Sequence, residues 1–244
     1  MHLGLAPFSK FLEITPGGSF AIPPRTVVFR FFSIGLATVF VALLTGVSAF
    51  SAQMAPATVN FTKTLKGSSP EYLSLSIDAN GAGSYDSHKL DDPSAPRPVQ
   101  ISAGTTTQIF SLVQSLNYLR SLSLDSRHKV ANMGLKTLTY QDRRETNRVQ
   151  FNYTEDRTAE QLTDILEKIS NVEERIALLE YAMKYDHLSL PQYLQQVQDG
   201  MNNHYFVEPE LMVPTLEKIS NDPHYLHLAQ SLARQIELRI QQNR

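Results

Sequence analysis

Hydrophobic positions recur with two different periods along this chain, and the change of period marks the predicted elements. Leu73, Leu75 and Ile77 alternate with polar residues, which is the pattern of a half-buried β-strand. The Asn-Gly pair within residues 78–81 is typical of a tight hairpin turn. The pattern therefore predicts a first β-hairpin, whose return strand begins at residues 83–85.

A helix, a second hairpin and a second helix are expected next. Residues 134–140 and 147–153 alternate in the same way around the charged turn QDRRET, which predicts the second hairpin. Helical spacing relates Ile109, Leu112, Val113, Leu116 and Leu119 in the first helix, and Leu162, Ile165, Leu166 and Ile169 in the second. Three prolines in residues 90–100 predict an exposed, extended connection. This order predicts an α+β domain over residues 58–170, with an antiparallel four-stranded sheet and two helices on one face.

Residues 171–244 are predicted to form a helical C-terminal extension. Three stripes of apolar residues recur at helical spacing and predict three amphipathic helices, the second of them broken at Gly200. The stripes are Val172, Ile176, Leu179 and Met183; Leu190, Tyr193, Leu194, Val197 and Met201; and Leu228, Leu232, Ile236 and Ile240.

The hexapeptide LEKISN occurs twice, at residues 166–171 and 216–221. In the first copy, Ser170 and Glu173 have the spacing of a capping box, which predicts the start of a new helix. The first copy is therefore expected to close the α+β domain. A duplication and the independent recurrence of a good helix junction both remain open as the origin of the two copies.

The second copy is also predicted to join two helices. Pro214 cannot lie inside a helix, so the helix that carries the second copy is expected to be short and to begin near that residue. Asp222 followed by Pro223 is a typical N-cap with proline at the first helical position, which predicts the start of the last helix there.

The longest apolar segment has twenty uncharged residues, begins with Phe31 and ends with Phe50. Arg25 and Arg30 precede it, and the next basic residue is Lys63. A segment of this length is directed to a membrane, and the charge asymmetry places its N-terminal side in the cytoplasm. The remainder of the chain is therefore expected to be exported.

Two fates of this segment are open, and both export residues 58–244. Residues 25–52 are either a signal peptide, with a small-residue cleavage pattern at residues 47–49, or an uncleaved membrane anchor. Residues 1–24 are either a cytoplasmic leader or the product of a wrongly assigned start. The expected location is thus periplasmic or extracellular, or the inner membrane with one N-terminal helix.

Composition and charge restrict the classes of partner and chemistry. Of the 244 residues, 42% are hydrophobic and 19% are charged, with a formal net charge of −2, as in ordinary globular proteins. This near-neutral net charge gives no electrostatic reason to expect nucleic acid as a partner, because recognition of its phosphates needs a net basic face. The chain has no cysteine, which excludes disulfides, thiolate metal ligands and cysteine nucleophiles.

The stretch SPEYLSLSIDANGAGSYD, followed by the helix, hairpin and helix, resembles a family of uncharacterised bacterial exported domains. The matching pattern is a Pro-x-Tyr strand, an Asp-x-x-Gly turn and a strand that ends in tyrosine. Its positions in this chain are Pro70, Tyr72, Leu75, Ile77, Gly81 and Tyr85. The resemblance covers residues 58–170 and implies an architecture without an assigned activity.

Candidate metal ligands are few. His224 and His227 are three residues apart in a predicted helix, with Glu217, Asp222 and His204 as further candidate ligands, so a metal-dependent hydrolase is one alternative. Amphipathic surface histidines are the simpler explanation, because the HEXXH motif is absent. Asp78, Asn80 and Asp86 weakly resemble a calcium loop, although a hairpin turn accounts for them.

Two surface features remain as candidates for binding. Arg143, Arg144 and Arg148 surround the second hairpin turn, where they either meet an anionic lipid headgroup or acidic glycan, or keep a sheet edge soluble. Tyr181 and Tyr185, one helical turn apart, either mark a protein-binding face together with Tyr193, Tyr205 and Phe206, or pack in the core.

The sequence thus favours an exported cell-envelope binding or structural module without catalysis and without a cofactor. No local motif marks a catalytic centre, and the expected partner is another envelope protein. The alternatives are the metal-dependent hydrolase at His224 and His227 and a membrane-anchored accessory subunit of a larger envelope complex. In the anchored case, the membrane contact is the segment from Phe31 to Phe50.

Overall fold

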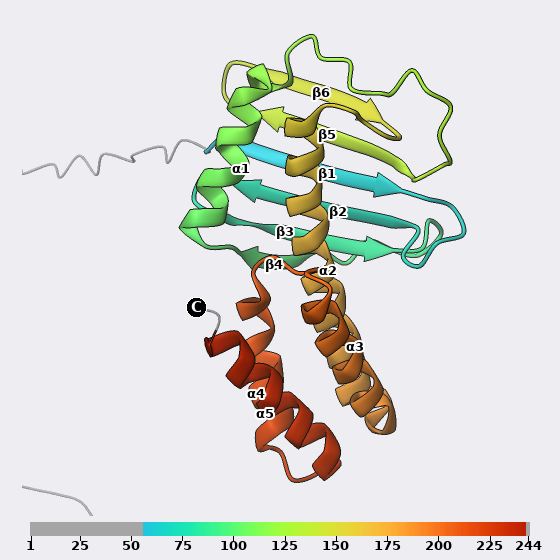
Figure 1. Ribbon diagram of the computed structural model, residues 1–244, viewed down its shortest axis with the longest axis vertical. Helices are drawn as coiled ribbons and strands as arrows, with labels where there is room; N and C mark the ends of the chain where they lie inside the picture. Colours follow the sequence, from blue (N-terminus) through green and yellow to red (C-terminus); the bar gives the residue numbers. More distant parts are fainter. Residues whose placement is uncertain (1–55, 243–244) are drawn as a thin grey trace, which may run out of the picture. The chain divides into compact units, whose positions relative to one another are not determined.

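The computed structural model describes residues 56–242 and shows an α+β fold with a six-stranded antiparallel sheet (Figure 1). The strands are β1 (Thr58–Thr64), β2 (Tyr72–Asp78), β3 (Ala82–His88), β4 (Arg97–Gln100), β5 (Leu135–Gln141) and β6 (Thr146–Phe151). They follow the order β4-β3-β2-β1-β5-β6 across the sheet. The α+β class and both predicted hairpins, β2–β3 and β5–β6, are confirmed, whereas the prediction of four strands is wrong.

The two additional strands, β1 and β4, lie in the middle and at one edge of the sheet. β1 lies between β2 and β5, yet only Val59 and Phe61 among its residues are buried. β4 lies within the segment predicted as an exposed connection and contains Pro98. This proline is tolerated because β4 is an edge strand that pairs with β3 alone. The backbone N–H groups on the open side of an edge strand have no partner strand, so the missing N–H of proline costs no hydrogen bond there.

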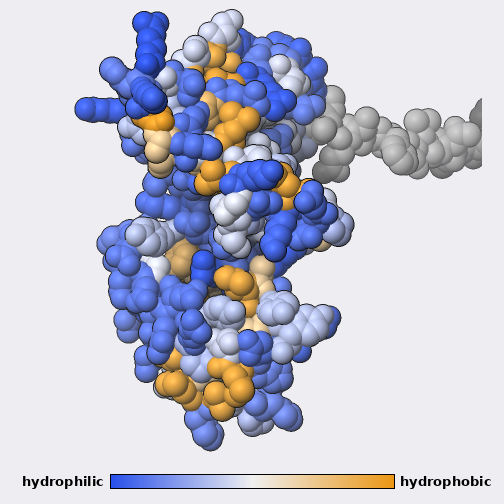
Figure 2. All heavy atoms as spheres, turned by 90° about the vertical axis from the view of Figure 1, so that its right-hand side faces the viewer, coloured by the Kyte–Doolittle hydropathy of each residue, from blue (hydrophilic) through white to orange (hydrophobic). Residues whose placement is uncertain are grey.

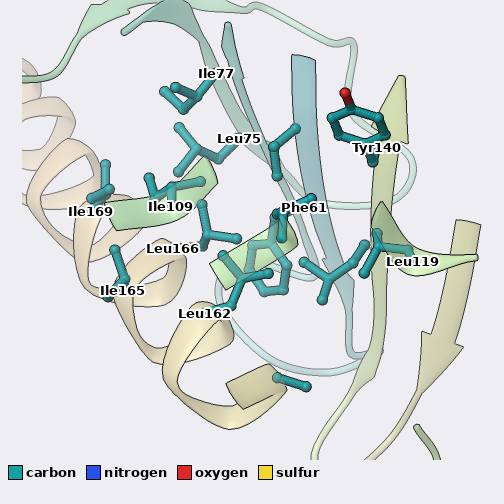
Figure 3. Close-up of a cluster of buried hydrophobic side chains, with 14 of the residues drawn as sticks. Phe61, Leu75, Ile77, Ile109, Leu119, Tyr140, Leu162, Ile165, Leu166 and Ile169 are labelled. Carbon is teal, nitrogen blue, oxygen red and sulfur yellow. The ribbon is translucent and has the colours of Figure 1, made fainter. Parts of the chain in front are cut away.

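Two helices, α1 (Ala103–Ser115) and α2 (Arg157–Tyr185), cover one face of the sheet, as predicted (Figure 1). Their apolar stripes meet the sheet's inward-facing side chains in one core cluster. Figure 3 shows Leu162 and Leu166 of α2 directed toward Phe61 of β1, with Ile109 of α1 beside them. The predicted hairpin turn is present, with Gly81 at a φ of +80° that favours glycine.

The first copy of LEKISN does not join two helices. It lies inside α2, which is one continuous helix of 29 residues and extends beyond the sheet. Ser170 donates its hydroxyl hydrogen to the carbonyl of Leu166, at 2.8 Å, and Glu173 is buried against the sheet, so the predicted capping box is wrong. Two core clusters meet along this helix: the sheet cluster ends with Ile169 and the helical cluster begins with Val172.

The helical cluster is completed by three more helices, α3 (Leu190–Asn202), α4 (Val213–Asn221) and α5 (His227–Gln242). Short 3-10 helices lie at Asn117–Leu119 (η1), His187–Ser189 (η2) and Pro209–Met212 (η3). The second LEKISN copy ends α4, a helix of nine residues with proline in its first turn, as predicted.

Two predicted details of this helical region are wrong. Gly200 does not break its helix, because α3 passes through it; a Cβ there would lie 2.4 Å from Cζ of Phe206. Glycine therefore makes room for a packed ring. Asp222 and Pro223 do not begin the last helix, which starts at His227. Asp222 instead accepts the backbone N–H of His224, at 2.9 Å, in a turn.

The apolar segment predicted as signal peptide or anchor lies outside the described residues. Within residues 56–242, no helix is both long and apolar enough to span a membrane.

Candidate binding surfaces

Exposed apolar side chains gather at the end of the helical region that is farthest from the sheet. There α2 gives way to η2, and the turn between α4 and α5 lies at the same end (Figure 1). The exposed fractions are 56% for Tyr181, 63% for Tyr185, 77% for Leu188 and 45% for Leu226. We call these four residues the apolar tip; Figure 2 shows apolar side chains at this lower end of the molecule.

Ring contacts tie the two turns of the apolar tip together. The rings of Tyr181 and Tyr185 have centroids 5.1 Å apart, since the residues are one helical turn apart. The rings of His187 and Tyr225 meet edge to face with centroids 5.2 Å apart, which joins η2 to the α4–α5 turn. The tip is therefore formed by two segments that are distant in the sequence.

The aromatic residues considered from the sequence divide into two groups. Tyr181 and Tyr185 are exposed, and so is Tyr205, with an exposed fraction of 56%, so core packing is wrong for these three. Tyr193 and Phe206 pack against the helical core, as core packing predicts. Sequence reasoning did not find Leu188 and Leu226, because both lie in turns and have no periodic neighbours.

A hollow of about 460 Å³ lies between the ends of β5 and β6 and the first half of α2. Lys63 and Lys136 face each other on adjacent strands, and both contact Oε1 of Glu167, at 3.0 and 3.4 Å. Two like charges at paired positions repel each other, so this carboxylate is needed between them. The lining also has carboxylates at Glu160 and Asp164. Charges of both signs therefore attach α2 to the sheet. Because they offset each other, the hollow has no strong positive or negative potential.

A charged contact joins the sheet edge to the middle of α2. Arg97 of β4 lies 3.9 Å from Glu173 and 3.4 Å from Glu180, on the side of α2 that faces the sheet. Burial raises the pKa of Glu173, Arg97 opposes that shift, and Glu180 adds to it. Nearby, burial raises the pKa of Tyr85 to about 12. Its hydroxyl makes no hydrogen bond to another described residue.

A second polar contact connects the segment before η3 to the first residues of α1. Glu208, at a φ of 65°, accepts hydrogen bonds from the hydroxyl of Ser102, at 2.6 Å, and from that of Thr105. A carboxylate is favoured at the N-terminus of a helix, where backbone N–H groups lack partners. These polar contacts are structural and connect the helical region to β4 and to the start of α1.

The histidines predicted as metal ligands are exposed and are not arranged on one helical face. His224 lies in the α4–α5 turn, with its Nδ1 2.7 Å from Oδ1 of Asp222, and His227 is the first residue of α5. His204 follows α3, and Glu217 lies on an exposed position of α4. Among residues 56–242, no group of three or more His, Asp or Glu side chains is placed to hold a metal ion.

The segment that weakly resembled a calcium loop forms a hairpin turn. Oδ1 of Asp78 accepts the backbone N–H groups of Asn80 and Ala82, at 2.7 and 3.0 Å. Asp86 lies on β3 and accepts hydrogen bonds from Ser94 and Ala95. These carboxylates are engaged by backbone and hydroxyl donors, which is what a turn requires.

No protein-family model matches the chain, and no curated protein matches its sequence.

Proposed function

We propose that this protein is an exported, non-catalytic binding module of the cell envelope and that it binds another envelope protein through the apolar tip. The single observation that carries the proposal is the exposure of Tyr181, Tyr185, Leu188 and Leu226 on one end of a helical region with a buried core of its own. Exposed apolar side chains that gather on one part of a domain's surface are typical of interaction sites.

The chemistry of the tip suits a protein partner. Tyrosine presents a large, stiff apolar area with a hydroxyl at its edge, and it is enriched among the residues that dominate binding energy. The tip is held by α2, whose other half is fixed against the sheet, so little ordering is required when a partner binds. The hydroxyls remain available for hydrogen bonds at the rim of the interface.

Export is the second component of the proposal and rests on the segment from Phe31 to Phe50. If this segment is retained, the protein is an accessory subunit that is anchored beside its partner. If it is cleaved, the module is released into the periplasm or the exterior. In both cases the binding surface lies in the exported part.

The test uses full-length protein with Tyr185→Ser and Leu188→Ser together. The matched control is Leu135→Ser with Leu238→Ser, which replaces two leucines that are 49% and 56% exposed and lie away from the tip, at the start of β5 and in the second half of α5. Each protein is used to capture partners from the bacterial envelope, and the captured protein is then purified and titrated directly. We expect the tip variant to weaken binding at least tenfold, since central contacts dominate interface energies, and the control to bind normally.

Two results would contradict the proposal. One is a purified partner that binds the tip variant and the wild type equally well. The other is an equal loss of binding in the control variant, which would assign the effect to general surface hydrophobicity. Circular dichroism of all three proteins establishes that each is folded.

A further inference from the structure

The β5–β6 turn lies at the end of the sheet where the described chain begins. Thr58, the first residue of β1, pairs with Gln141, the last residue of β5. Pro56 lines the same hollow as Arg143 and Arg144 of the turn. The polypeptide that follows the apolar segment therefore enters the sheet beside two arginines.

Three arginines at this turn are available to a partner. Arg143, Arg144 and Arg148 are exposed, and none of them forms an ion pair with another residue in the described range 56–242. The nearby Arg120 differs, because its guanidinium binds the carboxylate of Glu145. We call Arg143, Arg144 and Arg148 the basic turn.

The acidic residues at this end neutralise the basic turn only in part. Oδ1 of Asp142 accepts the backbone N–H groups of Arg144 and Glu145, at 2.7 and 2.9 Å, and these bonds hold the pKa of Asp142 below its usual range. Asp78 in the β2–β3 turn is likewise engaged by backbone N–H groups. Three unpaired guanidinium groups beside these two carboxylates leave this end of the sheet net positive.

The chain length between the apolar segment and the sheet is short. Five residues, 51–55, separate Phe50 from Pro56, and none of them is charged. A chain of this length spans at most about 20 Å. An anchor that ends at Phe50 would therefore keep the basic turn close to the membrane surface.

We propose that the chain keeps its apolar segment as a membrane anchor and that Arg143, Arg144 and Arg148 bind the phosphate groups of anionic lipids. A cation near an anionic membrane contributes about fivefold to binding, which alone gives weak attachment. The short tether supplies a high effective concentration of headgroups, so a weak contact suffices to hold the domain in one orientation. This inference rests on the anchor and is independent of the apolar tip.

The experiment uses the full chain in lipid nanodiscs and exploits the absence of cysteine. One fluorophore is attached at Thr146→Cys, an exposed position at the start of β6. In a second protein it is attached at Lys66→Cys, in the β1–β2 connection at the opposite end of the sheet. Nanodiscs contain either phosphatidylcholine alone or a mixture with phosphatidylglycerol, and a headgroup-bound quencher reports how close each label is.

We expect strong quenching at position 146 in the anionic nanodiscs, with weak quenching at position 66. Replacing all three arginines by glutamine should lower the equilibrium constant for binding of the basic turn to the membrane about 100-fold. Replacing them by lysine should preserve this constant, because the charge is kept. High salt should release the turn, since the contact is exposed.

Three results would overturn the inference. The first is complete separation of the chain from the nanodiscs, which would remove the anchor. The second is quenching at position 146 that does not depend on lipid charge, and the third is a glutamine variant that remains as strongly quenched as the wild type. None of these results bears on partner binding by the apolar tip, which the Tyr185 and Leu188 variants test separately.

Discussion

The sheet region and the helical region share one helix but present opposite kinds of surface. On the sheet, the face away from α1 and α2 carries small polar side chains along the central strands: Thr58, Asn60, Thr62, Thr64, Ser74, Ser76 and Thr139. The helical region instead exposes tyrosine and leucine at its far end. An antiparallel sheet can expose a hydroxyl-rich face to solvent without a partner. Exposed apolar side chains at the tip are unfavourable in water, and we propose that they are present because they bind a partner.

The largest expected losses of stability come from truncating one buried leucine in either core cluster. Leu166 in the sheet cluster and Leu216 in the helical cluster occupy the same position of the two LEKISN copies, and both are fully buried. Leu166→Ala and Leu216→Ala should each lower the free energy of unfolding by about 3 kcal/mol, because each leaves a cavity. Since α2 contributes to both clusters, each variant should unfold in a single transition.

Urea unfolding of the full chain in detergent, monitored by circular dichroism and tyrosine fluorescence, measures the free energy of unfolding and shows the number of transitions. Lys168→Ala and Lys218→Ala replace the corresponding lysines of the two copies and serve as controls, with losses below about 1 kcal/mol. Two separated transitions in either leucine variant would show that the two regions unfold independently despite the shared helix.

The same comparison shows how far the sequence specifies the fold. The hairpins β2–β3 and β5–β6 and the buried faces of α1 and α2 were predictable, because their apolar residues recur with a clear period. β4 was missed because Val99 is its one buried residue. β1 has as many buried residues as β2, and it was missed because the connection at residues 65–71 lacks the Asn-Gly turn that marked the β2–β3 hairpin.

The candidate site was predictable only in part. Tyr181 and Tyr185 lie off the apolar stripe predicted for their helix, and this was a signal that they face solvent. Leu188 and Leu226 join them only through the packing of two distant turns, which no local pattern encodes. The capping box at Ser170 and Glu173 failed for a similar reason, because Glu173 pairs with Arg97 from a distant strand.

A smaller effect on stability is expected from adding a methyl group at a glycine, and it should differ between the sheet and the helical region. A Cβ at Gly83 would lie 1.7 Å from the carbonyl oxygen of Ser76, which belongs to the backbone of the neighbouring strand. A Cβ at Gly200 would meet only the ring of Phe206. Gly83→Ala should therefore cost about 2 to 3 kcal/mol through overpacking. In Gly200→Ala, the gain of about 1 kcal/mol in helix propensity should offset much of the strain.

Thermal unfolding of the two alanine variants checks this difference. Repeating Gly200→Ala in a Phe206→Leu background isolates the ring contact, because a smaller side chain removes the clash. The expected order is a large drop in Tm for Gly83→Ala and a small change for Gly200→Ala. Equal drops would mean that the helical region is packed as rigidly as the sheet.

The smallest expected effect concerns the contact between the two regions. Because burial raises the pKa of Glu173 in the folded protein, folding favours the protonated carboxyl. Its contribution to stability is present in full below the unfolded pKa and is lost as the pH rises through the folded pKa. The Glu173→Gln side chain is neutral at every pH, so the stability of this variant relative to the wild type should increase as the pH rises from mildly acidic to neutral.

Tm values of both proteins across this pH range measure the difference, with Glu160→Gln as an exposed control on the same helix. A difference that stays constant with pH would show that Arg97 keeps Glu173 charged throughout, and that the two regions are joined by a permanent ion pair.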